Sequence, residues 1–250
     1  GKIYSFDKNQ NKNPTLHGGS DGSAVRNWKI VQYNKSMVTF LDKLPDGHMG
    51  FPGNLTVETT YKVAQSTIDI IIEASTDKTT LCNFTNHSYF NLDGTKNIAN
   101  HKLMVDCDKV LPVDENGIPI SGPIFAKDLD LDFKTGRTLN NNGKPIEVDH
   151  NFCISNTRQN LRRNAFVTAK NISLELFSTE PGLQVYTGKG LNSGNEKIWG
   201  KYPYREFAGI ALEPQIWPDA PNQIDFPNPL LQPGDKYKHH TRLKFSRTKI

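Results

Sequence analysis

The feature that most constrains the fold is an alternation of apolar and polar residues in short runs. In residues 57–63 (VETTYKV), Val57, Thr59, Tyr61 and Val63 share one face of an extended chain, and the polar residues between them share the other. A period of two residues is what a half-buried β-strand requires, and no segment shows a sustained helical period. Further strands are predicted at residues 67–74, 103–106, 172–177, 183–187 and 241–245.

Turn signals separate these runs. They include the Asp-Gly and Asn-Gly pairs at residues 46–47, 93–94, 116–117 and 142–143, and the chain contains 15 prolines. Many short strands with frequent turns indicate an all-β fold, a sandwich or a barrel. Since no fixed repeat or Gly/Ser-rich linker occurs, we predict one domain over residues 1–250. The proline-rich stretch 214–233 is predicted to be a long ordered loop packed on the sheet, with Trp217 as a core anchor or, as the alternative, a platform for a sugar ring.

Composition excludes several other classes of protein. The formal charge of +4 is spread along the chain rather than gathered into a patch, so we expect no nucleic-acid partner. Cys82, Cys107 and Cys153 are far apart and form no C-x-x-C pair, which favours buried thiols over disulfides or a zinc site. Because no apolar run approaches about 18 residues and no signal peptide is evident, we expect no membrane association and a cytoplasmic location.

Four short segments combine titratable side chains with glycine or aromatic neighbours: residues 16–19 (LHGG), 86–92 (NHSYFNL), 149–152 (DHNF) and 212–219 (LEPQIWPD). A single histidine is more often structural than catalytic, and the glycines after His17 can simply form a turn. His87, however, is surrounded by Asn, Ser and Tyr, which suits a cleft where sugar hydroxyls need hydrogen-bond partners.

These segments, in this order, resemble the aldose 1-epimerase (galactose mutarotase) family along nearly the whole chain. The stretches that carry the resemblance are LHGG (16–19), DGHMGFPGNLTVETTY (46–61), NHSYFNLDG (86–94), VDHNF (148–152), PGLQVYTG (181–188), LEPQIWPDAPNQIDFPNPLLQPGDKY (212–237) and the closing LKFS (243–246).

The resemblance implies a large antiparallel β-sandwich of the galactose mutarotase-like supersandwich type, with an open cleft across one sheet. It places the general acid at His87, the general base at Glu213 and a second active-site histidine at His17. Asp149 and Gln184 fall on positions that bind sugar hydroxyls in the family. We add Asn86 to the predicted substrate-binding residues because it adjoins His87 in the same motif. The predicted activity is interconversion of the α and β anomers of a free aldohexose such as galactose or glucose.

The residue types also fit this chemistry directly. Opening a cyclic hemiacetal removes a proton from the anomeric hydroxyl and delivers one to the ring oxygen, so an acid and a base must flank the ring. A Glu and a His can hold opposite protonation states near neutral pH. We therefore expect no metal or other cofactor, and a monomer or homodimer whose only required partner is the sugar.

The N-terminal region departs from the family pattern. Family members carry a further segment before LHGG with an Asn-Arg pair whose arginine helps to hold the substrate, and Arg26 is not its equivalent. We therefore expect the domain to be N-terminally incomplete here. Two alternatives stay open: a non-catalytic sugar-binding or regulatory relative, and an enzyme for a hexose phosphate, which would require basic side chains around the cleft.

Overall fold

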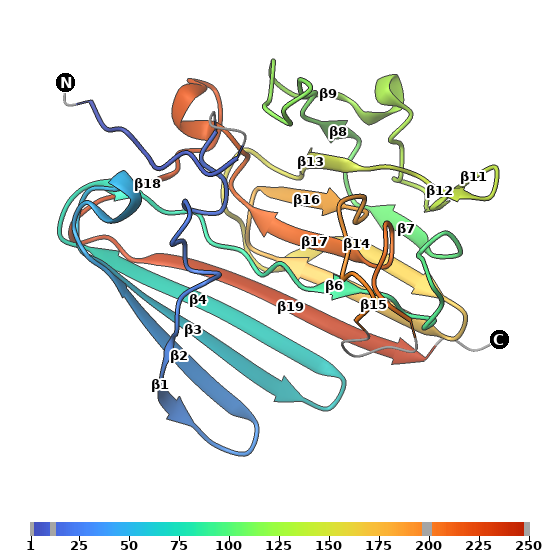
Figure 1. Ribbon diagram of the computed structural model, residues 1–250, viewed down its shortest axis with the longest axis horizontal. Helices are drawn as coiled ribbons and strands as arrows, with labels where there is room; N and C mark the ends of the chain where they lie inside the picture. The colour runs from blue at the N-terminus through green and yellow to red at the C-terminus, as the bar shows by residue number, and fades with distance from the viewer. Residues whose placement is uncertain (1–2, 11–13, 197–201, 248–250) are drawn as a thin grey trace. The chain divides into compact units, whose positions relative to one another are not determined.

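The computed structural model describes residues 3–10, 14–196 and 202–247, and the regular structure in these ranges is almost entirely β (Figure 1). The all-β prediction is confirmed. The helices among the described residues are short 3-10 segments, and none of them has the length and apolar character to cross a membrane. They are η1 (His48–Gly50), η2 (Ala126–Leu129) and η3 (Ala220–Asn222).

The chain divides into two compact units, one formed by Gly1–Phe84 with Pro229–His240 and the other by Thr85–Asn228 with Thr241–Ile250. The two units differ in their internal contacts, and this division does not test the prediction of one domain. The single domain over residues 1–250 therefore stays a prediction.

The first unit is built from antiparallel hairpins. Its strands lie in the order β1-β2-β3-β4-β19, and a separate short pair joins β5 to β18. The bounds are β1 (Lys29–Tyr33), β2 (Met37–Leu44), β3 (Leu55–Ala64), β4 (Thr67–Thr76), β5 (Thr80–Leu81), β18 (Leu230–Leu231) and β19 (Tyr237–Arg247), which continues into the second unit after His240.

The alternation that predicted β3 is present over most of the strand. Leu55, Val57 and Thr59 are buried, as a one-sided strand requires. Val63 is 52% exposed, so its predicted place on a buried face is wrong. The exposure is local: Val63 lies next to the β3–β4 hairpin turn, where Gln65 has a positive φ of 52°, and its strand neighbours Lys62 and Ala64 are exposed as well.

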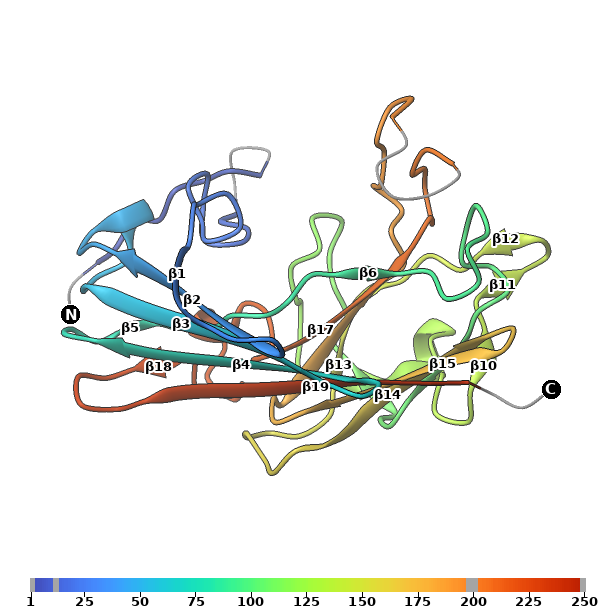
Figure 2. The same ribbon diagram turned by 90° about the horizontal axis from the view of Figure 1, so that it is seen from below.

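The second unit contains two antiparallel sheets, with the strand orders β19-β15-β14-β7-β10 and β6-β17-β16-β13-β8-β9. Figure 2 shows the ribbons of β6 and β17 above those of β14 and β15. The bounds are β6 (Tyr89–Phe90), β7 (Lys102–Val105), β8 (Lys109–Val110), β9 (Ile124–Phe125), β10 (Arg137–Thr138), β13 (Asp149–Cys153), β14 (Arg162–Ala169), β15 (Ile172–Ser178), β16 (Gly182–Tyr186) and β17 (Ile210–Gln215). A small hairpin joins β11 (Asn140–Asn141) to β12 (Lys144–Pro145).

Both sheets of this unit bury apolar side chains. Leu103 and Leu174 are completely buried in the first sheet, and Leu183 and Phe152 in the second. The ring of Phe152 packs edge-on against that of Phe133, at 6.1 Å between centroids. One face of the second sheet is thereby committed to the core, which leaves its other face for polar side chains.

The proline-rich stretch differs from the predicted loop because it contains the end of β17, the 3-10 helix η3 and the short strand β18. Pro214 lies inside β17, paired opposite Leu183, so the loop begins later than residue 214. A proline lacks the N–H that a strand donates, and it is accommodated here one residue before the strand ends. Trp217 is 3% exposed and packs edge-on against Phe226, which confirms the core-anchor interpretation.

The cysteines agree with the sequence prediction. Cys82, Cys107 and Cys153 are all buried thiols outside any disulfide. Burial raises the pKa of the Cys107 and Cys153 thiols, so both side chains stay protonated and unreactive at neutral pH.

Candidate active site

Strand register places the central polar residues of the site in one row. Gln184 on β16 pairs with Glu213 on β17 at one side and with Asn151 on β13 at the other. Directly opposed residues of an antiparallel pair point to the same face of the sheet. Side chains from three separate parts of the sequence therefore lie side by side.

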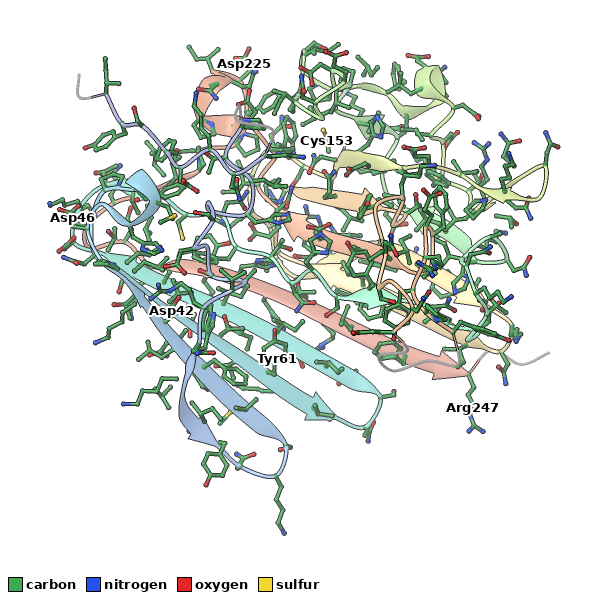
Figure 3. The ribbon with its side chains drawn as sticks, in the orientation of Figure 1. Asp42, Asp46, Tyr61, Cys153, Asp225 and Arg247 are labelled. Carbon is green, nitrogen blue, oxygen red and sulfur yellow. The ribbon has the colours of Figure 1, made fainter. Side chains whose placement is uncertain are left out.

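A second row lies two residues further along the same face. Tyr186 pairs with Asp149 on one side and with Ala211 on the other, and Ala211 in turn pairs with Tyr89 on β6. Because side chains alternate along a strand, this row shares its face with the row of Gln184. We call this the site face. Figure 3 draws the side chains on the ribbon, with Cys153 labelled at the end of β13.

The residues between these positions explain why the site face is polar. Leu183 and Val185 on β16 and Leu212 on β17 point to the opposite face and are buried in the core. The period-two pattern of LQVY and ALE thus directs leucine and valine inward and glutamine, tyrosine and glutamate toward the site face.

His87 and Glu213, the predicted acid and base, lie together. His87 lies two residues before β6, and its Nε2 atom is 3.4 Å from Oε1 of Glu213. The side chain of His87 is 31% exposed, whereas that of Glu213 is 7% exposed. An accessible imidazole is therefore in contact with a carboxyl group that is nearly withdrawn from water.

Burial changes the proton affinity of Glu213. Loss of solvation raises its pKa to about 8, and the negative charge of Asp149 adds to the effect. A proton on His87 acts in the opposite direction, because a cation 3.4 Å away favours the carboxylate. When ionised, Glu213 is thus a stronger base than an ordinary glutamate.

Asp149 and Gln184 are linked by a hydrogen bond. Gln184 Nε2 donates to Asp149 Oδ1 at 2.6 Å, and Asp149 is exposed. A carboxylate and a carboxamide offer several acceptors and donors, the groups that a ring of sugar hydroxyls requires. Among the described residues, no group of three or more His, Cys, Asp or Glu side chains could hold a metal ion.

Two tyrosines belong to the site although the sequence reasoning assigned them no role. The ring of Tyr89 lies 5.0 Å from the ring of His87, and that of Tyr186 lies 6.4 Å from it. Burial raises the pKa of Tyr89 to about 12, with smaller contributions from Tyr186, Glu213 and Asp149, so its phenol remains a hydrogen-bond donor at neutral pH. The alternation in residues 182–187 placed Tyr186 beside Gln184, which was the available signal.

The other predicted residues have distinct positions. Asn86 adjoins His87 and accepts a hydrogen bond from the backbone N–H of Ser88 at 3.2 Å, so its carboxamide helps to shape the loop that carries His87. His17 belongs to the first unit, where it has a φ of 52° in a turn closed by Gly19 N–H donating to the carbonyl of Leu16. The LHGG glycines do form a turn, and the roles of His17 and Asn86 stay predictions. His150 points away from the site face, and burial lowers its pKa.

Comparison with known proteins agrees with the geometry. The family model for aldose 1-epimerase matches residues 1–244. The aldose 1-epimerase of Escherichia coli K12 is 35% identical over 243 residues, which covers 92% of this chain and 70% of the relative. The human galactose mutarotase is 37% identical over 258 residues, which covers 98% of this chain and 73% of the relative.

Solved structures show the same fold. An aldose epimerase homologue from C. elegans superposes with a TM-score of 0.90 at 27% identity, covering 99% of this chain and 77% of the other. A galactose 1-epimerase from Lactobacillus acidophilus gives a TM-score of 0.83 at 25% identity, covering 99% and 74%. Sequence and fold lead to one conclusion: this chain belongs to the aldose 1-epimerase family.

Proposed function

We propose that the chain catalyses the interconversion of the α and β anomers of free hexoses such as galactose or glucose, with His87 as general acid and Glu213 as general base. Relatives named aldose 1-epimerase and galactose mutarotase, each at least 35% identical over most of this chain, support the activity. The alternative of a non-catalytic sugar-binding relative has no support from these comparisons.

The reaction needs two proton transfers in each direction. Glu213 takes the proton of the anomeric hydroxyl while His87 gives a proton to the ring oxygen, and the bond between the anomeric carbon and the ring oxygen breaks to leave an open-chain aldehyde. Rotation about the bond between the first two carbons presents the other face of the carbonyl. On ring closure Glu213 gives its proton to the carbonyl oxygen, and His87 takes one back from the hydroxyl that becomes the ring oxygen again, so both side chains return to their starting states.

The observation that carries the proposal is the contact between His87 and Glu213, with Nε2 and Oε1 separated by 3.4 Å. Because the anomeric hydroxyl and the ring oxygen are bonded to the same carbon, two side chains this close together can reach both oxygens at once. The buried carboxyl has the raised pKa that a general base needs near neutral pH.

Neighbouring side chains suit the orientation of the sugar. We assign hydroxyl binding to Asp149 and Gln184, which are already hydrogen-bonded to each other, and to the phenol of Tyr89. A sugar hydroxyl that joins this network both donates and accepts, so desolvation of the ring is compensated.

Polarimetry of freshly dissolved α-D-galactose and α-D-glucose tests the proposal. We expect the chain to accelerate mutarotation above the uncatalysed rate, and His87→Asn and Glu213→Gln to lower kcat at least about a hundredfold each, the usual loss of an acid or base. His150→Asn is the matched control, since His150 points to the opposite face, and should retain kcat within about threefold. A folded chain without acceleration would instead identify a sugar-binding protein, and full activity in the His87 and Glu213 variants would place the acid and base elsewhere.

A further inference from the structure

His87 does not belong to a β-strand, so strand pairing does not fix its position. His87 precedes β6, which begins at Tyr89, and its side chain is 31% exposed. A histidine in such a segment can rotate about two side-chain bonds, and only one orientation brings Nε2 to Glu213. Side-chain contacts must therefore contribute to holding the ring.

We propose that Tyr186 is a positioning residue that holds the imidazole of His87 against Glu213. The inference rests on the proposed function of His87 as the general acid. Tyr186 packs against His87 with an interplanar angle of 81° and a centroid distance of 6.4 Å, an edge-to-face arrangement that aromatic rings prefer.

A third ring completes the support. Tyr89 lies 5.0 Å from His87 and 6.2 Å from Tyr186, so each ring of the trio contacts the other two. Ala211 is the cross-strand neighbour of both tyrosines, and its methyl group leaves room for their rings to close over it.

Tyr186 is itself fixed at both ends. Its backbone lies within β16, paired on one side with β13 and on the other with β17. Its hydroxyl accepts a hydrogen bond from the backbone N–H of Gly190 at 2.5 Å. A Cβ atom added to Gly190 would lie 2.8 Å from this hydroxyl oxygen, so glycine permits the close approach. A ring anchored in this way can restrict the rotation of the neighbouring His87 side chain.

The kinetic consequence separates positioning from binding. Loss of the Tyr186 ring lets His87 leave the productive orientation, which should lower kcat more than it changes KM. We expect Tyr186→Leu to lower kcat about five- to tenfold, the scale of one aromatic pair, with KM within about twofold. Tyr186→Phe keeps the ring and loses only the bond to Gly190, so it should restore kcat to within about threefold of wild type.

Tyr61→Leu is the matched control. Tyr61 makes an edge-to-face pair with Phe40 in the first unit, at 6.1 Å and 81°, so the same substitution removes the same kind of contact. Its kcat should stay within about twofold of wild type when the folded fraction is taken into account.

An NMR measurement tests the contact without reference to activity. The ring hydrogens of His87 should shift between the wild-type chain and Tyr186→Leu, because the ring current of Tyr186 is lost, and should be largely unshifted in Tyr186→Phe. Unchanged His87 signals, or a raised KM at unchanged kcat, would overturn the positioning role. If the wild-type chain proves inactive while the His87 signals shift, the proposed function fails and the structural contact stands.

Discussion

At the scale of single residues, the site depends on two titratable groups in unequal surroundings. Glu213 is buried beside the negative charge of Asp149, and His87 is partly open to water. Unequal environments are the usual way in which one site supplies both an acid and a base.

The raised pKa of Glu213 predicts the pH dependence of the reaction. Below its pKa of about 8 the base is mostly protonated, and its ionised fraction grows about tenfold per pH unit, so the pH profile of kcat/KM should bend near pH 8. Asp149→Asn removes a charge that raises this pKa and should move the bend to lower pH. Polarimetry between about pH 5.5 and 9 measures both. A bend near the ordinary glutamate range, or one that Asp149→Asn leaves in place, would contradict the assignment.

The same pKa has a consequence for folding stability. Glu213 is raised from 4.5 to about 8 in the folded chain, so the folded state binds the proton more tightly than the unfolded state. The contribution of Glu213 to the free energy of unfolding is therefore fully present below about pH 4.5 and is lost as the pH rises through 8. The loss is on the order of a few kcal/mol. Glu213→Gln has no charge to bury, so its stability relative to wild type should increase between pH 5 and pH 8 in urea unfolding. A difference that stays constant with pH would show that Glu213 titrates normally.

At the scale of elements, β16 is the strand that organises the site. It is paired on both sides, and it carries Gln184 and Tyr186 on the site face. Gly182 begins the strand on this face, where an added Cβ would lie 2.5 Å from Asn151 Oδ1 and 2.8 Å from Trp217 Cδ1. The glycine therefore allows β13 and the Trp217 anchor to approach β16.

We expect Gly182→Ala to lower the free energy of unfolding by about 1–3 kcal/mol, because the new methyl group overpacks a closed space. Gly122→Ala is the matched control, since a Cβ at Gly122 meets no atom within 4 Å and should be tolerated. Urea unfolding of both variants gives the comparison. Equal stabilities would mean that Asn151 and Trp217 move aside without cost.

The strands of the site could be predicted in part from local pattern. Alternation placed Gln184 and Tyr186 on one face, and β16 shows that arrangement. The row of Asn151, Gln184 and Glu213 could not be derived in this way, because pairing joins strands that are remote in sequence. Pro214 was predicted to lie in a loop because the residues after it are rich in proline. It lies instead in β17, one residue before the strand ends.

At the scale of the whole molecule, the all-β class followed from period-two runs and turns, whereas the choice of site residues depended on family motifs. With the exception of His17, the predicted site residues lie in the second unit. The contact between His87 and Glu213 joins a loop residue to a strand residue more than a hundred positions later in the chain, a pairing that no spacing rule specifies.

His17 provides a test at this scale. The family resemblance gives it an active-site role, while the structure places it in a turn with a φ of 52°. Asparagine tolerates this conformation, so His17→Asn should preserve the turn and the urea midpoint while lowering kcat/KM at least about tenfold. Unchanged kcat/KM would show that His17 has no active-site role.

The measurement that tests the central claim most directly is a double-variant cycle for His87 and Glu213, followed by polarimetry of α-D-galactose. When an acid and a base act as one unit, removing either one already removes most of the rate acceleration. The kcat of His87→Asn/Glu213→Gln should therefore lie within about threefold of the kcat of the slower single variant. Losses that multiply across the two single variants, or a double variant close to wild type, would show that the two side chains do not form the catalytic pair.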